Sequence, residues 1–174
     1  MTLRSHYLAS TLFVLTATAA ATLPAEAQGV LTTHRLSAAL ASEAVSEAVA
    51  ACAKQGYKVV ATIVDIDGVP QAMLRGDVAA MTGMEASRDK AYTALMLGAP
   101  RNEATSGAVA QRMGATPSPG GLAKLHHILL TPGAIVIRAD GEAIAAIGVG
   151  GAPGGDLDEA CAKAGVDKIS DRLK

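Results

Sequence analysis

The sequence predicts an α+β domain in which helices cover an antiparallel sheet built from two or more β-hairpins. Stretches rich in Val, Ile and Ala flank Asp67-Gly68, and two more such stretches flank Asp140-Gly141. An Asp-Gly pair between such stretches is typical of a β-hairpin, in which the two strands are antiparallel. Segments with a helical spacing of apolar residues precede, separate and follow the hairpins. The expected order is therefore helix, hairpin, helices, hairpin, helix.

The strands are expected at residues 58–65, 69–74, 134–138 and 143–150. Each hairpin is expected to close through a two-residue turn, at Asp67-Gly68 and at Asp140-Gly141, because Asp and Gly both tolerate positive φ. The strands alternate only weakly between apolar and polar residues, so helices should cover the apolar faces of the sheet.

Helices are expected from Thr32 or Thr33 to about Gln55, over residues 82–97 and 102–113, and from Asp156 to about Leu173. Gly56 is placed to end the first helix, and Asp156 with Glu159 has the spacing of an acidic capping box for the last helix. Residues 115–121 are rich in Pro and Gly and predict a loop, whereas residues 122–130 fit either a helical turn or an extended segment.

The first 27 residues have the organisation of a secretory signal peptide. Arg4 precedes a nearly uncharged apolar run over residues 8–23, and Ala25-Glu26-Ala27 then matches a cleavage site. A membrane anchor is the competing interpretation, but the run is short and rich in Thr and Ala compared with a span of about 20 apolar residues. We therefore expect a signal peptide over residues 1–27, a single domain over residues 28–174, and an exported protein, periplasmic or secreted, with no stable membrane insertion after cleavage.

The composition argues against a nucleic-acid-binding protein. The formal net charge is −1, so no basic surface is indicated. Removal of the signal peptide leaves Tyr57 and Tyr92 as the aromatic residues, which is too few for a base-stacking platform.

The glycine-rich stretch at residues 148–155 matches neither common nucleotide-binding motif. No Gly-Lys-Ser/Thr follows it, and Pro153 occupies the place of the last glycine in G-x-G-x-x-G. A tight strand-to-helix corner is favoured over an anion site at the following helix.

Cys52 and Cys161 remain after cleavage, and the sequence leaves two interpretations open. Both cysteines lie at buried helix positions, where free Cys behaves as a small apolar residue. An oxidising compartment also permits a disulfide between them, provided that their Cα atoms lie within about 7 Å.

Two groups of residues are candidates for binding a ligand. Lys90 and Thr93 share one helix face, next to small alanines that leave room for a flat molecule; a packed amphipathic helix is the competing interpretation. His126 and His127 are adjacent and so point in different directions. An isolated His is most often a half-buried polar residue, but its neutral imidazole is also a common ligand of haem iron.

Four segments of the chain, taken in order, resemble the GlcG/HbpS family, which also includes the C-terminal domain of PduO-type proteins. They are Val64-Asp65-Ile66-Asp67-Gly68, Lys90-Ala91-Tyr92-Thr93-Ala94, Gly141 with Ile147-Gly148-Val149-Gly150-Gly151, and Asp156-Leu157-Asp158-Glu159-Ala160-Cys161 with Ala164-Gly165. Each segment is weak evidence alone, but the ordered set extends over residues 31–169.

The resemblance implies a profilin-like α/β sandwich, a homo-oligomer, and haem binding at Lys90, Thr93, His126 and His127. Lys90 would pair with a propionate, and His126, or else His127, would be the ligand of the haem iron. The expected function is an exported haem-binding protein that scavenges, degrades or senses haem. The alternative is a binding or accessory protein for another small metabolite, glycolate-type or corrinoid-linked, without haem. The resemblance leaves open whether the protein is an enzyme; if it is, Asp65 would join Lys90 and Thr93 at the pocket.

Overall fold

The structure is a computed structural model that describes residue 29, residues 31–115 and residues 120–174. The predicted signal peptide and the centre of the predicted 115–121 loop therefore lie outside the described residues. One compact unit comprises Thr33–Lys174, and the following description concerns this unit. None of the helices within the described residues has the length and apolar character needed to cross a membrane.

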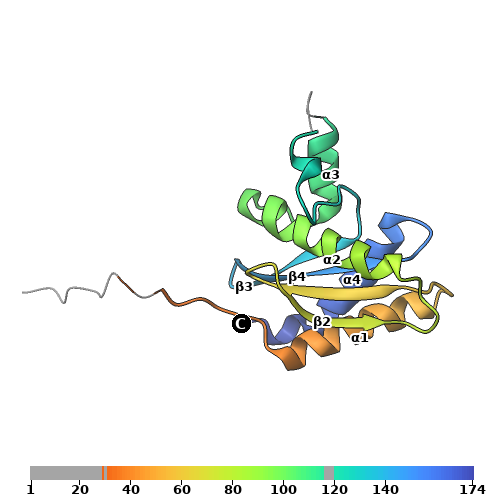
Figure 1. The fold of residues 1–174 in the computed structure, drawn as a ribbon. Helices are drawn as coiled ribbons and strands as arrows, with labels where there is room; N and C mark the ends of the chain where they lie inside the picture. The colour runs from red at the N-terminus through yellow and green to blue at the C-terminus, as the bar shows by residue number, and fades with distance from the viewer. Residues whose placement is uncertain (1–28, 30, 116–119) are drawn as a thin grey trace, which may run out of the picture. The chain divides into compact units, whose positions relative to one another are not determined.

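A four-stranded antiparallel sheet forms the centre of the unit, as predicted (Figure 1). Its strands are β1 (Val60–Asp65), β2 (Pro70–Arg75), β3 (Ala134–Ala139) and β4 (Glu142–Gly150), in the spatial order β2-β1-β4-β3. The two hairpins join through pairing of β1 with β4, which runs from Val60 opposite Gly150 to Asp65 opposite Ala145. These central strands are almost entirely buried because helices cover both faces of the sheet.

The two hairpin turns differ, although both contain Asp-Gly. Asp140 and Gly141 have φ values of 46° and 84°, which is the predicted two-residue turn. The corresponding prediction for the first hairpin is wrong, because Gly68 (φ 79°) has positive φ there and Asp67 does not. The side chain of Asp65 explains the difference: its Oδ1 accepts hydrogen bonds from the backbone N–H groups of Asp67 and Val69, both at 3.0 Å.

Helices α1 (Ala38–Ala53) and α4 (Gly155–Ile169) pack against each other and against the same face of the sheet. The predicted start of α1 at Thr32 or Thr33 is wrong, because Ser37 is the N-cap and its Oγ accepts from Leu40 N at 3.3 Å. The predicted end is correct, since Gly56 adopts a φ of 80° just after the helix.

The predicted capping box of the last helix is also wrong. Gly154 is the N-cap of α4, so no side-chain hydrogen bond caps the start of this helix. Glu159 instead accepts a hydrogen bond from Gly133 N at 3.2 Å, so it ties the helix to the entry of β3.

Helices α2 (Thr82–Thr93) and α3 (Ser106–Gly114) lie on the opposite face of the sheet (Figure 1). The predicted 82–97 helix changes at Ala94 into a π-helical turn, η1 (Ala94–Gly98), followed by the 3-10 turn η2 (Ala99–Arg101). Helix α3 begins four residues later than predicted, at Ser106 instead of 102, because Thr105 is its N-cap.

The ambiguous 122–130 segment contains one 3-10 turn, η3 (Leu122–Lys124), and is otherwise irregular.

The main core lies between the sheet and the helices α1 and α4, and a disulfide crosses it. Cys52 and Cys161 are bridged, with a Cα–Cα distance of 5.6 Å. The helices approach each other closely at Gly165, where a Cβ atom would lie 2.5 Å from the carbonyl oxygen of Ala44. The structure thus decides between the two interpretations of the cysteines in favour of the bridge.

We expect the Cys52→Ala/Cys161→Ala double variant to unfold with a free energy about 2–4 kcal/mol lower than the wild type. The bridge joins residues 109 positions apart, so its loss frees a long loop in the unfolded chain. Urea unfolding with and without reductant measures the effect. The double variant should be insensitive to reductant, and a wild type whose unfolding midpoint is also insensitive would contradict the bridge.

Candidate functional site

Lys90 lies inside the protein, with a side chain 6% exposed. Its Nζ donates to Asp158 Oδ2 at 2.6 Å and to the carbonyl oxygen of Val149 at 3.2 Å. The other oxygen of Asp158 accepts from Ala152 N at 2.9 Å. Lys90 thus links α2 to β4 and to the start of α4, and its ammonium is occupied by the protein itself. Sequence reasoning missed Asp158, because a buried acid within a helix has no sequence motif of its own.

Thr93 is completely buried on the same helix and holds a different segment. Its Oγ1 donates to the carbonyl oxygen of Asp89 at 2.7 Å and accepts from Leu129 N at 2.8 Å. Thr93 therefore attaches the 122–130 segment to α2. Neither Lys90 nor Thr93 reaches an exposed surface, and both act on the architecture around the candidate site.

His126 and His127 are exposed on the segment that Thr93 attaches to α2. His127 has a φ of 66°, a conformation that is uncommon for residues other than glycine and that often marks functional positions. Its Nδ1 lies 3.2 Å from Asp89 Oδ1, and its ring packs edge-on against Tyr92 with centroids 5.8 Å apart. When Nδ1 donates its proton to Asp89, the lone pair of Nε2 is left free for a ligand.

The ring of His126 lies 6.2 Å from that of His127, tilted by 52°. Within the described part of the chain, no hydrogen bond involves the His126 ring. Among the described residues the two neighbouring imidazoles thus differ, because a carboxylate orients the His127 ring and no hydrogen bond orients the His126 ring.

Large apolar side chains are exposed on the same segment. Leu122 and Leu125 are 40% and 55% exposed, which is unusual for leucines in a folded domain. We call Leu122, Leu125, His126 and His127 the histidine segment. Sequence reasoning missed the leucines, because an ambiguous segment does not reveal which of its apolar residues face the solvent.

A groove of about 860 Å³ lies between α3 and α4. Ala108, Pro132, Ile135 and Val166 contribute apolar walls, and Glu159 is among the polar groups of its lining. Its volume is within the range of small-molecule sites.

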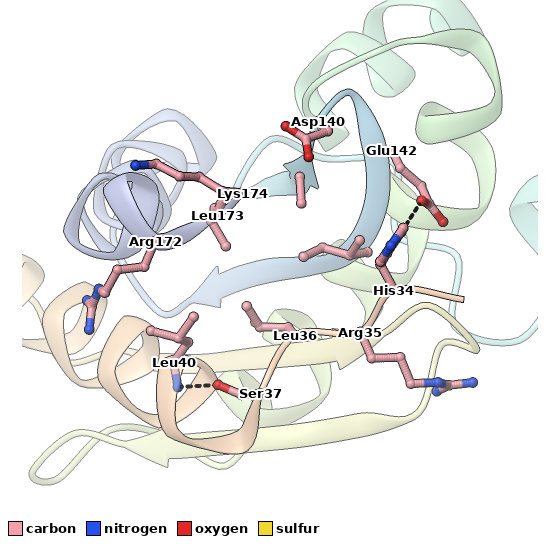
Figure 2. A pocket seen from close by; sticks show the side chains of 12 residues that line it. His34, Arg35, Leu36, Ser37, Leu40, Asp140, Glu142, Arg172, Leu173 and Lys174 are labelled. Carbon is pink, nitrogen blue, oxygen red and sulfur yellow. Dashed lines mark hydrogen bonds and ion pairs between the residues drawn. The ribbon is translucent and has the colours of Figure 1, made fainter. Parts of the chain in front are cut away.

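A second hollow, of about 280 Å³, lies where the C-terminal residues meet the segment before α1 (Figure 2). Leu36 and Leu173 are among the apolar residues that line it, and His34 and Glu142 lie together at one side, with Nδ1 2.7 Å from Oε2. This hydrogen bond, and then the charge of Glu142, raise the pKa of His34 above its ordinary value of 6.5.

We expect the pKa of His34 to fall towards 6.5 in the Glu142→Gln variant. Because the folded-state pKa of His34 is raised, the ion pair stabilises the folded state at pH values below 6.5. This stabilisation is lost as the pH rises through the folded-state pKa. Titration of the imidazole protons by NMR measures this change. Asp140→Asn is the matched control, with a smaller decrease, since Asp140 acts through its charge alone. Equal His34 pKa values in the wild type and Glu142→Gln would contradict the assignment.

We expect Lys90→Met to lower the free energy of unfolding by about 3–5 kcal/mol, because it leaves the buried carboxylate of Asp158 unpaired. The Lys90→Met/Asp158→Asn double variant should lose less than the sum of the two single variants. Chemical unfolding of the four proteins gives the coupling. Lys163→Met, which breaks the exposed Lys163–Asp167 pair, is the control and should change stability by less than about 1 kcal/mol. Additive single effects would show that the buried pair is not coupled.

Comparison with known proteins agrees with this fold. The sequence model of a family described as "HbpS-like: Haem degrading protein HbpS-like" matches residues 36–167. The solved structure of a double mutant of Streptomyces reticuli HbpS is 33% identical, with a TM-score of 0.73, and the match covers 86% of this chain and 97% of that one. A second HbpS structure is 32% identical, with a TM-score of 0.72, and the match covers 83% of this chain and 97% of that one. No curated protein matches the chain.

A more distant structure, that of a PduOC–haem complex, shares the fold at 22% identity and a TM-score of 0.64, over 78% of this chain and 96% of that one. The α+β fold therefore matches the folds of the solved HbpS structures. Because the family match extends over most of the domain and the HbpS structure agrees at 33% identity, this chain belongs to the HbpS-like family.

Proposed function

We propose that this protein is exported and binds haem at the histidine segment, where an imidazole is the ligand of the iron. The observation that carries the proposal is the pairing of His127 with Asp89, at 3.2 Å, on an exposed segment. A carboxylate that accepts the Nδ1 proton fixes the tautomer and the orientation of a ligating histidine, and this arrangement is typical of metal-bound imidazoles. The family description, which concerns haem degradation, supports the same ligand.

The residues of the segment fit the chemistry of haem. His127 presents Nε2, and His126, the ligand expected from sequence, is its unconstrained neighbour. The exposed Leu122 and Leu125 supply apolar contact area for a macrocycle. Lys124 is exposed on the same segment and replaces Lys90 as the cation for a propionate, because Lys90 is engaged by Asp158.

Lys90 and Thr93 enter this proposal as positioning residues. Thr93 holds the backbone at Leu129, two residues after His127, against α2. Asp89 and Tyr92, which contact the His127 ring, belong to the same helix. Lys90 fixes that helix to β4 and α4 through its hydrogen bonds to Val149 and Asp158.

Export is supported by two independent features. Residues 1–27 have the pattern of a cleaved signal peptide. The Cys52–Cys161 disulfide is of a kind that persists in oxidising compartments and is rare in the cytosol. A periplasmic or secreted location is consistent with both the signal-peptide pattern and the disulfide.

We expect haemin added to the purified domain to give a shifted, saturable Soret band. His127→Ala should remove the shift, and Asp89→Asn should weaken binding about tenfold, because it releases the orientation of the imidazole. His34→Ala, a histidine at the far hollow, is the matched control and should bind as the wild type does. Light scattering during the titration reports the homo-oligomer that the family resemblance implies.

Other outcomes redirect the proposal. A shift that is lost in His126→Ala and retained in His127→Ala would move the iron ligand to His126. If neither the wild type nor any variant shifts the Soret band of added haemin, haem binding is rejected and the alternative small metabolite is favoured. Addition of a reductant to the complex separates binding from degradation, because degradation destroys the Soret band over time.

A further inference from the structure

Arg138, on β3, carries a charge that no acidic group of the described residues neutralises. Its Nη1 donates to the carbonyl oxygen of Gly141 at 2.9 Å, and its Nη2 donates to that of Ala99 at 3.2 Å. Carbonyl groups orient a guanidinium but leave its net charge in place. By contrast, Arg88 and Arg172 each form an ion pair with a carboxylate. Arg138 is thus held in one orientation, and three of its five N–H donors have no partner among the residues that the structure describes.

The guanidinium lies at a pocket of about 380 Å³ whose other walls are largely apolar. Ile66 of the first hairpin, Ala143 of the second, and Leu95 and Met96 of the η1 turn line it. This volume is within the range of small-molecule sites, in which an apolar lining typically surrounds a few polar groups that fix the orientation of the ligand.

The pocket is built into the fold by the π-helical turn. Insertions of this type within helices occur frequently at functional sites. Met96 of η1 and Tyr92, near the end of α2, pack against the first hairpin at Gly68, where a Cβ atom would lie 2.8 Å from Met96 Cε and 2.6 Å from Tyr92 Cε2. The glycine therefore permits the close contact that holds the hairpin tip at the edge of the pocket.

Glu142 is the acidic residue of the pocket lining, and its carboxylate is engaged elsewhere. Figure 2 shows its side chain turned towards His34, with Oε2 2.7 Å from Nδ1. An anion in the pocket would therefore meet the positive charge of Arg138, while the carboxylate of Glu142 is turned away and hydrogen-bonded to His34.

We propose that this pocket binds a small carboxylic acid with an apolar body. Its carboxylate accepts hydrogen bonds from Arg138, and its apolar body contacts Ile66, Leu95 and Ala143. Charge-assisted hydrogen bonds from a planar guanidinium to a carboxylate are among the stronger polar contacts in proteins. The inference goes beyond haem binding and does not rest on it, because the pocket shares no residue with the histidine segment.

Calorimetric titration of the full domain with hexanoate tests this site, with hexan-1-ol as the uncharged comparison. Hexanoate should bind saturably with one site per chain, and hexanol should bind at least about tenfold more weakly, because it lacks the charge. Arg138→Gln should weaken hexanoate binding by a similar factor. Arg101→Gln, an exposed arginine that does not line the pocket, is the matched control and should bind as the wild type does.

Ala143→Leu fills the pocket while it leaves Arg138 in the sequence, and it should abolish hexanoate binding, so the proposal remains testable even if Arg138→Gln does not fold. Equal binding of hexanoate and hexanol, or full binding by the filled variant, would overturn the site. The haemin titration should be unchanged in Ala143→Leu, which separates this inference from the proposed function.

Discussion

The buried ion pair between Lys90 and Asp158 joins α2, on one face of the sheet, to α4, on the other face. Buried charges are tolerated when they are paired and hydrogen-bonded, and here the ammonium also reaches the carbonyl of Val149 while the carboxylate also accepts from Ala152. One contact therefore fixes α2, the end of β4 and the start of α4. Gly133 makes room for it, because a Cβ atom there would lie 2.7 Å from Lys90 Nζ.

Helix α2 and its continuation η1 serve both candidate sites. The Asp89 and Thr93 end of α2 orients His127 and holds the histidine segment, whereas Leu95 and Met96 of η1 line the Arg138 pocket. The residues proposed for the two sites therefore follow one another along a single helix, which Lys90 anchors to β4 and α4. The close approach of α2 to β4 depends on Gly148, where a Cβ atom would lie 2.1 Å from the carbonyl oxygen of Ser87.

Local sequence patterns predicted elements more accurately than they predicted their ends. The Asp-Gly pairs located both hairpins, but Asp65 captures the backbone of the first turn and changes its geometry. The Asp156 and Glu159 spacing suggested a cap, whereas Glu159 serves the entry of β3. In each case a side chain found a partner that competes with the local pattern, and that partner is visible only once the chain has folded.

The sequence by itself determined the order of helices and strands, the antiparallel sheet and the family, because these depend on periodicity, turn chemistry and ordered motifs. It also selected Lys90, Thr93, His126 and His127 as residues of interest. The tertiary structure decided where each residue lies: Lys90 and Thr93 are buried and hydrogen-bonded within the protein, while the histidines are exposed. It also brought together Cys52 with Cys161, His127 with Asp89, and Arg138 with its apolar pocket. These contacts join residues far apart in the chain, and their formation depends on packing and burial, which no local pattern encodes.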